Sequence, residues 1–194
     1  LTLLLPDYKR FKARHSRIYA LNRWQPPTFS FVPVIASLVV GADGSTSKDG
    51  RSAGVSSAAD RRAFLARRRT ADALLIGGNT ARNEPYQKTP VPVVVVSKSM
   101  LNPLSNNRLA HWWNCEPAEA LARAQRLFGE TIVIESGISI IEELIAAKKV
   151  DRLELSVTSV TAGEDQVDFK KLLSKFSNVT ERVEEDTTFY TATN

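Results

Sequence analysis

Short, uninterrupted apolar runs constrain the fold of this chain more than any other feature. Ala73–Ile76, Val93–Val96 and Ile132–Ile134 are such runs, and the first and last are soon followed by glycine. A strand that is apolar on both faces is typical of a parallel sheet covered by helices on both sides. Helix signals lie between the runs: a capping box opens a helix over residues 57–70, and Pro117 opens another that ends before Gly129.

The remaining segments continue this alternation. Further strands are predicted over residues 29–40, 152–160, 179–183 and 187–193, the last two as a terminal antiparallel pair. Ser139 is expected to cap another helix, and residues 169–176 have helical spacing. The predicted fold class is α/β, with a mixed, mainly parallel central sheet flanked by helices.

The composition is that of a globular protein. A chain of 194 residues with 43% hydrophobic and 24% charged residues is expected to form one domain, or at most two small ones. The single cysteine excludes an internal disulfide framework and a multi-cysteine zinc site. No apolar run approaches the roughly 18 residues that a membrane span needs, so we expect a cytoplasmic protein without membrane contact.

The net charge of +5 is concentrated at the start of the chain. Residues 1–24 carry six bases and one acid, which accounts for the whole excess. We therefore predict a basic N-terminal extension over residues 1–24 and a folded domain over residues 25–194. Residues 43–90 carry nine bases and five acids, and this local excess in a neutral body favours a small phosphorylated ligand over nucleic acid.

Two strand–glycine–helix junctions carry the strongest chemical signal. They are Ile76-Gly77-Gly78-Asn79-Thr80 and Glu135-Ser136-Gly137-Ile138-Ser139. Helix N-termini offer unpaired N–H groups, and glycine lets an anion approach the backbone, so the two junctions together suit a dinucleotide's phosphates. Neither a G-x-G-x-x-G nor a P-loop pattern is present. Ser97-Lys98-Ser99 is either a 2′-phosphate contact or a polar turn.

Other chemistries lack suitable residues. His15 and His111 are the only histidines, and Cys115 has no basic neighbour in the sequence that would activate it. We expect no metal site. The arginines of the 57–70 helix form stripes, one of which could face a cleft and bind a phosphate.

Taken in order, these motifs resemble the pyrimidine reductases of riboflavin biosynthesis. Residues 39–44 are similar to the S-x-D-G segment of that family, residues 71–84 to its glycine–threonine junction, and residues 132–137 and 150–153 complete the order. The resemblance covers about residues 29–194. It implies a three-layer dihydrofolate-reductase-like fold, a homodimer, and NADPH-dependent reduction of a 5-phosphoribosylamino-pyrimidine to its ribitylamino product.

The resemblance and the junctions together assign candidate site residues. The cofactor-facing positions are Val39, Gly54, Gly77, Gly78, Thr80, Glu84, Ser97, Lys98, Gly137, Ile138, Ser139, Ile140 and Ile141. The substrate-facing positions are Ser37, Ser52, Arg68 and Glu135. Arg68 suits the 5-phosphate and Glu135 the ribose hydroxyls, and the expected catalytic residues are Glu135 and Asp43.

Three positions depart from the family pattern. Ser37 stands where many members have Lys or Asn, Gly41 where they have Ser, and Ser136 where they have the first glycine of E-G-G. Two alternative functions therefore stay open. One is a reductase of the same fold that acts on another carbonyl or pteridine compound, and the other is a catalytically silent binding domain.

Overall fold

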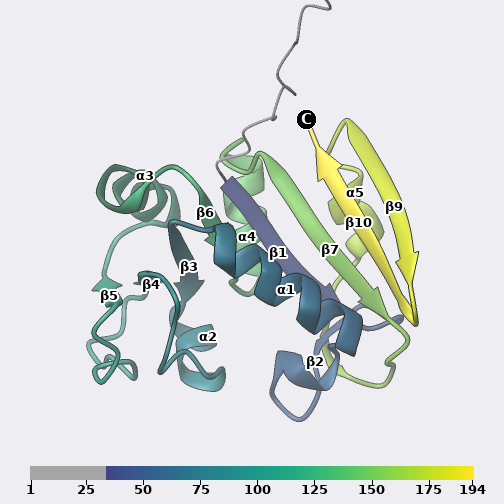
Figure 1. The fold of residues 1–194 in the computed structure, drawn as a ribbon, viewed down its shortest axis with the longest axis horizontal. Coiled ribbons are helices and arrows are strands. Elements are labelled where there is room, and N and C mark those ends of the chain that lie inside the picture. The colour runs from purple at the N-terminus through teal and green to yellow at the C-terminus, as the bar shows by residue number, and fades with distance from the viewer. Residues whose placement is uncertain (1–33) are drawn as a thin grey trace, which may run out of the picture. The chain divides into compact units, whose positions relative to one another are not determined.

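The computed structural model describes residues 34–194, whose largest sheet has eight strands (Figure 1). In sheet order these are β5 (Ala110–Trp113), β4 (Val93–Val96), β3 (Ala73–Gly77), β6 (Ile132–Ile134), β1 (Val34–Val40), β7 (Arg152–Thr158), β10 (Thr187–Thr193) and β9 (Asn178–Glu184). The first six run parallel, whereas β10 and β9 pair antiparallel. The predicted mixed, mainly parallel sheet is confirmed. The expected N-terminal extension and the start of the first strand lie outside the described residues.

Within residues 34–194, five α-helices cover the two faces of this sheet. They are α1 (Ala58–Thr70), α2 (Gly78–Asn83), α3 (Pro117–Phe128), α4 (Ile138–Ala146) and α5 (Phe169–Leu173). Leu121 of α3, Leu144 of α4 and Leu172 of α5 are buried in one core with the sheet. On the opposite face, Ala71 after α1 and Ala81 of α2 pack in a second core. Figure 1 shows α1 lying across the sheet in front of β1, with α4 behind.

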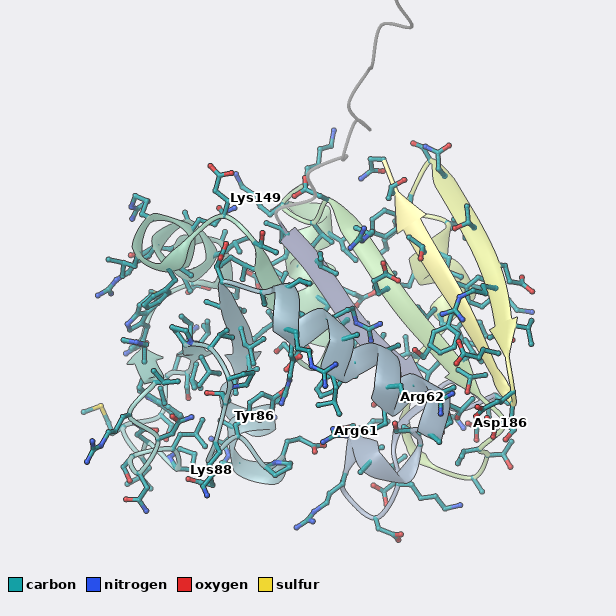
Figure 2. All side chains as sticks on the ribbon, in the orientation of Figure 1. Arg61, Arg62, Tyr86, Lys88, Lys149 and Asp186 are labelled. Atoms are coloured by element: carbon teal, nitrogen blue, oxygen red, sulfur yellow. The ribbon has the colours of Figure 1, made fainter. Side chains whose placement is uncertain are left out.

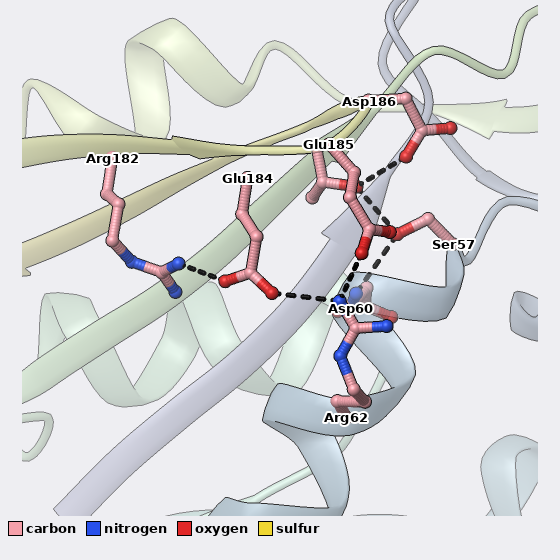
Figure 3. Close-up of polar contacts among 8 residues, drawn as sticks. Ser57, Asp60, Arg62, Arg182, Glu184, Glu185 and Asp186 are labelled. Carbon is pink, nitrogen blue, oxygen red and sulfur yellow. Dashed lines mark hydrogen bonds and ion pairs between the residues drawn. The ribbon is translucent and has the colours of Figure 1, made fainter.

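The N-terminal half of α1 is attached to the β9–β10 hairpin (Figure 3). The Ser57 hydroxyl accepts a hydrogen bond from the Asp60 backbone N–H at 3.0 Å and lies 2.6 Å from the Thr187 hydroxyl. The Arg62 guanidinium lies 2.9 Å from Glu184 and 2.7 Å from Glu185. These contacts hold α1 over the sheet and so place the arginines of its last turns.

Several boundaries differ from the sequence prediction. Ser139 does not cap α4: the helix begins at Ile138, Gly137 is its N-cap, and Ser139 lies inside the first turn. Three short strands were not predicted: β5, and the pair β2 (Ser45–Ser47) and β8 (Glu164–Gln166). Each lacks a run of buried apolar residues and is defined by backbone pairing to a distant segment, which periodicity does not report. In residues 34–194, no helix is long and apolar enough to cross a membrane.

Candidate functional site

A cavity lies at the carboxyl ends of three parallel strands, β3, β4 and β6. Its volume is about 270 Å³, and its lining residues are Gly77, Gly78, Asn79, Thr80, Arg82, Ser97, Ser136, Gly137, Ser139 and Ile140. Parallel strands place their carboxyl ends at one edge of a sheet, where α/β proteins bind ligands. The fold therefore brings together the two glycine junctions that the sequence separates by more than 50 residues.

The glycines of this cavity differ in what surrounds them. A Cβ atom added at Gly78 would lie 2.6 Å from the Ser97 hydroxyl, so packing alone excludes a larger residue there. A Cβ atom added at Gly137 would meet no atom of residues 34–194 within 4 Å, and the backbone φ of −61° suits any residue. Gly137 thus leaves space that the protein itself does not use.

Polar groups around the cavity suit an anionic ligand. The Ser136 hydroxyl is buried and has no hydrogen-bond partner among the described residues. Gly137 precedes α4, whose first N–H groups have no partner within the helix and carry the positive end of its dipole. Arg82 adds a cationic side chain, hydrogen-bonded to the Asn79 amide oxygen.

Three lining residues were not among the predicted site residues: Asn79 and Ser136, which lie within the two glycine junctions, and Arg82. Arg82 lies four residues after Gly78 on α2, so helical periodicity alone places it on the glycine face. Ser136 precedes Gly137, and its hydroxyl lies 3.0 Å from the position of a Cβ at Gly77. No sequence signal distinguishes it from a turn serine.

Six predicted cofactor residues do not line the cavity. They are Val39, Gly54, Glu84, Lys98, Ile138 and Ile141. Ile141 is fully buried in the core, and the Lys98 side chain is exposed and lies 3.7 Å from Glu116. Glu84 accepts a hydrogen bond of 2.7 Å from the backbone N–H of Ser52, so the structure links one residue predicted for the cofactor with one predicted for the substrate.

Asp43 lies outside the cavity lining and holds a turn. Its carboxylate accepts hydrogen bonds from the Ser45 hydroxyl at 2.7 Å, the Ser45 N–H at 3.1 Å and the Ala162 N–H at 2.8 Å. The Ser45 hydrogen bonds lower the pKa of Asp43. Its contacts are those of a residue that joins the β1–β2 turn to the segment before β8.

Glu135 is the centre of a second polar group, on the α1 side of the sheet. Its side chain is 2% exposed and that of Arg68 is 11% exposed. The Arg68 Nε and Nη2 donate to the carboxylate at 2.8 and 2.6 Å, and the Tyr86 hydroxyl donates to it at 2.8 Å. Figure 2 shows Tyr86 in the segment that follows α2. Two predicted substrate residues, Arg68 and Glu135, are therefore paired with each other.

Burial and the contacts with Glu135 together shift the pKa values of Tyr86 and Arg68. Burial, and then the charge of Glu135, raises the pKa of Tyr86 well above its ordinary value, so its hydroxyl remains a donor. For Arg68, burial acts against the charged form, but the hydrogen bonds and charge of Glu135 outweigh it and raise the pKa. The Arg68 guanidinium also lies over the rings of Phe64 and Tyr86, at 4.2 and 4.8 Å.

Ser37, the remaining predicted substrate residue, contacts a different arginine. Its hydroxyl accepts a hydrogen bond of 3.2 Å from the Nε of Arg67. Burial lowers the pKa of Arg67, against the charges of Glu154, Asp60 and Glu135. In residues 34–194, no group of three or more His, Cys, Asp or Glu side chains is placed to hold a metal ion.

The chain matches a known protein family and is similar in fold to solved structures. The family model of the RibD C-terminal domain matches residues 33–187. No curated protein sequence matches significantly.

Solved structures share the fold at low sequence identity. A diaminohydroxyphosphoribosylaminopyrimidine deaminase/5-amino-6-(5-phosphoribosylamino)uracil reductase from Thermotoga maritima matches with a TM-score of 0.61 and 13% identity, over 83% of this chain and 56% of that one. The riboflavin biosynthesis reductase Rib7 of Saccharomyces cerevisiae matches with a TM-score of 0.54 and 13% identity, over 84% and 90%. The Enterococcus faecalis dihydrofolate reductase, solved with NADP(H), matches with 0.58 and 17%, over 82% and 95%. The chain spans little more than half the length of the Thermotoga protein. The predicted dihydrofolate-reductase-like fold is confirmed.

Proposed function

The chain belongs to the RibD C-terminal domain family, and from this premise we propose that it is an NADPH-dependent reductase. Its proposed substrate is a 5-phosphoribosylamino-pyrimidine, whose ribosylamino group it converts to a ribitylamino group. Two structural relatives, the Thermotoga and Saccharomyces proteins, are reductases by name. The observation that carries the proposal is the single cavity lined by both glycine junctions.

The lining residues fit a nicotinamide dinucleotide. Gly137 leaves room at the start of α4 that no protein atom fills, and the unpartnered Ser136 hydroxyl lies beside it. Backbone N–H groups at a helix start bind phosphate, and Arg82 supplies a positive charge to the same cavity. We propose that Gly137, Ser139 and Arg82 hold the phosphates, with Thr80 and Ser97 adding hydroxyl contacts.

When bound, NADPH supplies the hydride for the reduction. The open-chain ribosylamine is an imine, so hydride at C1′ and a proton at the nitrogen give the ribitylamine. Glu135 follows β6 and directly precedes the cavity residue Ser136, which places it between the cavity and α1. Among residues 34–194, only the Arg68 Nε donates to the Oε1 oxygen of Glu135, so this oxygen retains acceptor capacity for a ribose hydroxyl. We propose that Arg68 and Tyr86 hold the Glu135 carboxylate in position for this contact.

The direct test is turnover with a defined substrate. Purified protein is incubated with NADPH and 5-amino-6-(5-phosphoribosylamino)uracil, the loss of nicotinamide absorbance is followed, and the product is identified by mass spectrometry. We expect NADPH consumption that depends on the pyrimidine, with a product heavier by two hydrogens. A folded protein that binds NADPH but consumes none with this substrate would contradict the proposed activity.

One observation favours a second candidate. Because Arg68 is paired with Glu135, its charge is already balanced by a protein carboxylate, which suits a reductase that acts on an unphosphorylated carbonyl or pteridine compound. The same assay with the dephosphorylated pyrimidine separates the two candidates. The first requires the dephosphorylated compound to be turned over more slowly than the phosphorylated one. The second requires that the phosphate does not increase the rate of turnover. Absence of NADPH binding would instead favour a catalytically silent domain.

A further inference from the structure

Two adjacent arginines near the end of α1 differ in how their charges are balanced. Arg68 has a full set of partners: a carboxylate that it contacts with two nitrogens, and two aromatic rings. Arg67 donates one hydrogen bond, from Nε to the Ser37 hydroxyl at 3.2 Å. Its Nη2 atom is buried and has no hydrogen-bond partner among residues 34–194.

Among residues 34–194, no carboxylate forms an ion pair with Arg67. Three acids act on it through space: Glu154, Asp60 and Glu135. Glu135 is bound by Arg68, and Glu154 lies 2.9 Å from the Nε of Arg152. Asp60 is seven residues earlier on the same helix, which is a rise of about 10 Å, and it accepts a hydrogen bond from the Ser56 hydroxyl.

Such an arrangement needs an explanation, because a largely buried guanidinium with one hydrogen bond and an unpartnered Nη2 is unfavourable. The loss of hydration is not offset by an ion pair or by a full set of hydrogen bonds. Residues that break a local rule in this way are expected at ligand sites, where the missing partner is supplied by the ligand. Arg67 as a whole is partly exposed, whereas its Nη2 atom is buried, so a ligand that pairs with Nη2 must be met by a shift of this side chain.

We propose that Arg67, rather than Arg68, binds the anionic group of the substrate, and that this group is a phosphate monoester. The site lies between α1 and β1, with Ser37 as the second hydrogen-bonding group. Arg67 is adjacent to Arg68 on α1, and Arg68 contacts Glu135; in the proposed site the ribose is held at Glu135 and its phosphate at Arg67. The identity of the ligand rests on the proposed function, whereas the site rests on the contacts of Arg67.

Binding of ribose 5-phosphate, compared with ribose, tests this site without cofactor or turnover. Calorimetry is done on the wild type, Arg67→Ala, Arg67→Lys and Arg68→Ala. We expect the wild type to bind ribose 5-phosphate more tightly than ribose, and Arg67→Ala to weaken the phosphorylated sugar roughly 10- to 150-fold while leaving ribose unchanged. Arg67→Lys should recover part of the loss, because an ammonium carries the charge without the planar fork.

The matched control is Arg69→Ala. It removes the same charge two residues further along α1, where the side chain is exposed, so a general loss of positive potential would affect Arg67→Ala and Arg69→Ala alike. If Arg68→Ala removes the phosphate preference and Arg67→Ala keeps it, Arg68 is the phosphate ligand and the proposal is wrong. Absence of ribose 5-phosphate binding by the wild type also overturns it.

A stability measurement separates ligand binding from a structural role. Arg67→Met keeps an unbranched apolar stem and removes the guanidinium with its unpaired charge, so we expect no loss in the urea concentration at the unfolding midpoint. A clear decrease would show that Arg67 supports the fold. NADPH binding at the cavity is measured in the same variants: its failure in the wild type contradicts the proposed function but leaves the ribose 5-phosphate result intact.

Discussion

Gly137 is a glycine that the proposed cofactor site explains and that packing does not. At most glycines of residues 34–194, a neighbouring atom leaves no room for a Cβ atom, as the Ser97 hydroxyl does at Gly78. At Gly137 neither the backbone angle nor a neighbouring atom requires glycine. A substitution there therefore tests the cavity with little effect on the fold.

We predict that Gly137→Val weakens NADPH binding at least tenfold, about 1.4 kcal/mol, because the added methyl groups occupy the start of α4. The free energy of unfolding should fall by only about 1 kcal/mol, since the change affects one helix cap. Calorimetry and urea denaturation check the two values. Ala122→Val, at an exposed position of α3, is the matched control; equal NADPH affinity in both variants would contradict the assignment.

Tyr86 gives a prediction about pH. Its pKa is raised in the folded state, so above about pH 10 the unfolded chain loses the phenolic proton first and the wild type becomes less stable as the pH rises. Tyr86→Phe should remove this part of the decline. At neutral pH it should cost roughly 1.5–3 kcal/mol, because the hydrogen bond to the Glu135 carboxylate is lost. Urea denaturation of both proteins between about pH 8 and 11 measures the slopes; parallel slopes would rule out this origin.

At the scale of elements, α1 links the β9–β10 hairpin to the polar group around Glu135. Its start contacts the β9–β10 hairpin (Figure 3), and its last turns carry Arg67 and Arg68. The helix itself is only weakly amphipathic, since Ala59 and Asp60 are its buried residues. Its position therefore depends on the polar contacts at its start more than on an apolar face.

We predict that Ser57→Ala lowers the free energy of unfolding by roughly 0.5–2 kcal/mol, because the cap to Asp60 and the contact with Thr187 are both lost. Chemical denaturation measures the change. Thr70→Ala, at the other end of the helix and exposed, should stay within about 0.5 kcal/mol of the wild type. If the two variants lose equal stability, the Ser57 contacts at the start of α1 contribute no more to the free energy of unfolding than an exposed position does.

At the scale of the whole molecule, the cavity joins elements that are distant in the sequence. It is formed by residues at the carboxyl ends of β3, β4 and β6, which are neighbours in the sheet in the order β4-β3-β6. A ligand bound there contacts segments that separate when the chain unfolds. Binding at this cavity should therefore stabilise the fold as a whole.

We predict that NADPH at about 100 times its dissociation constant adds about 2.7 kcal/mol to the stability of the wild type. For a domain of this size that raises Tm by roughly 5–11 °C. Differential scanning calorimetry with increasing NADPH measures the shift. The Gly137→Val protein at the same concentrations is the comparison, and a shift of the same size in that variant would place NADPH elsewhere.

Much of the fold was predictable because its main signals are local. The helices α1 and α3 begin and end where their caps and glycine indicate, and the apolar runs form central strands. The predicted N-cap of α4, Ser139, was wrong because its capping pattern lies next to a glycine that could also begin the helix. Only backbone geometry shows that Gly137 precedes the first helical residue. The strands β5, β2 and β8 depend on partners far along the chain, so local patterns did not indicate them.

By itself the sequence determined the element types, the central strands and the two glycine junctions, because periodicity, capping and glycine content act over a few residues. Only the tertiary structure decided which side chains meet. It pairs Arg68 with Glu135 across 67 residues, and Arg67 with Ser37 across 30 residues. Both arginines lie side by side in one basic helix, so the sequence treats them alike. The difference in their partners arises because consecutive helix positions project about 100° apart, toward different parts of the sheet.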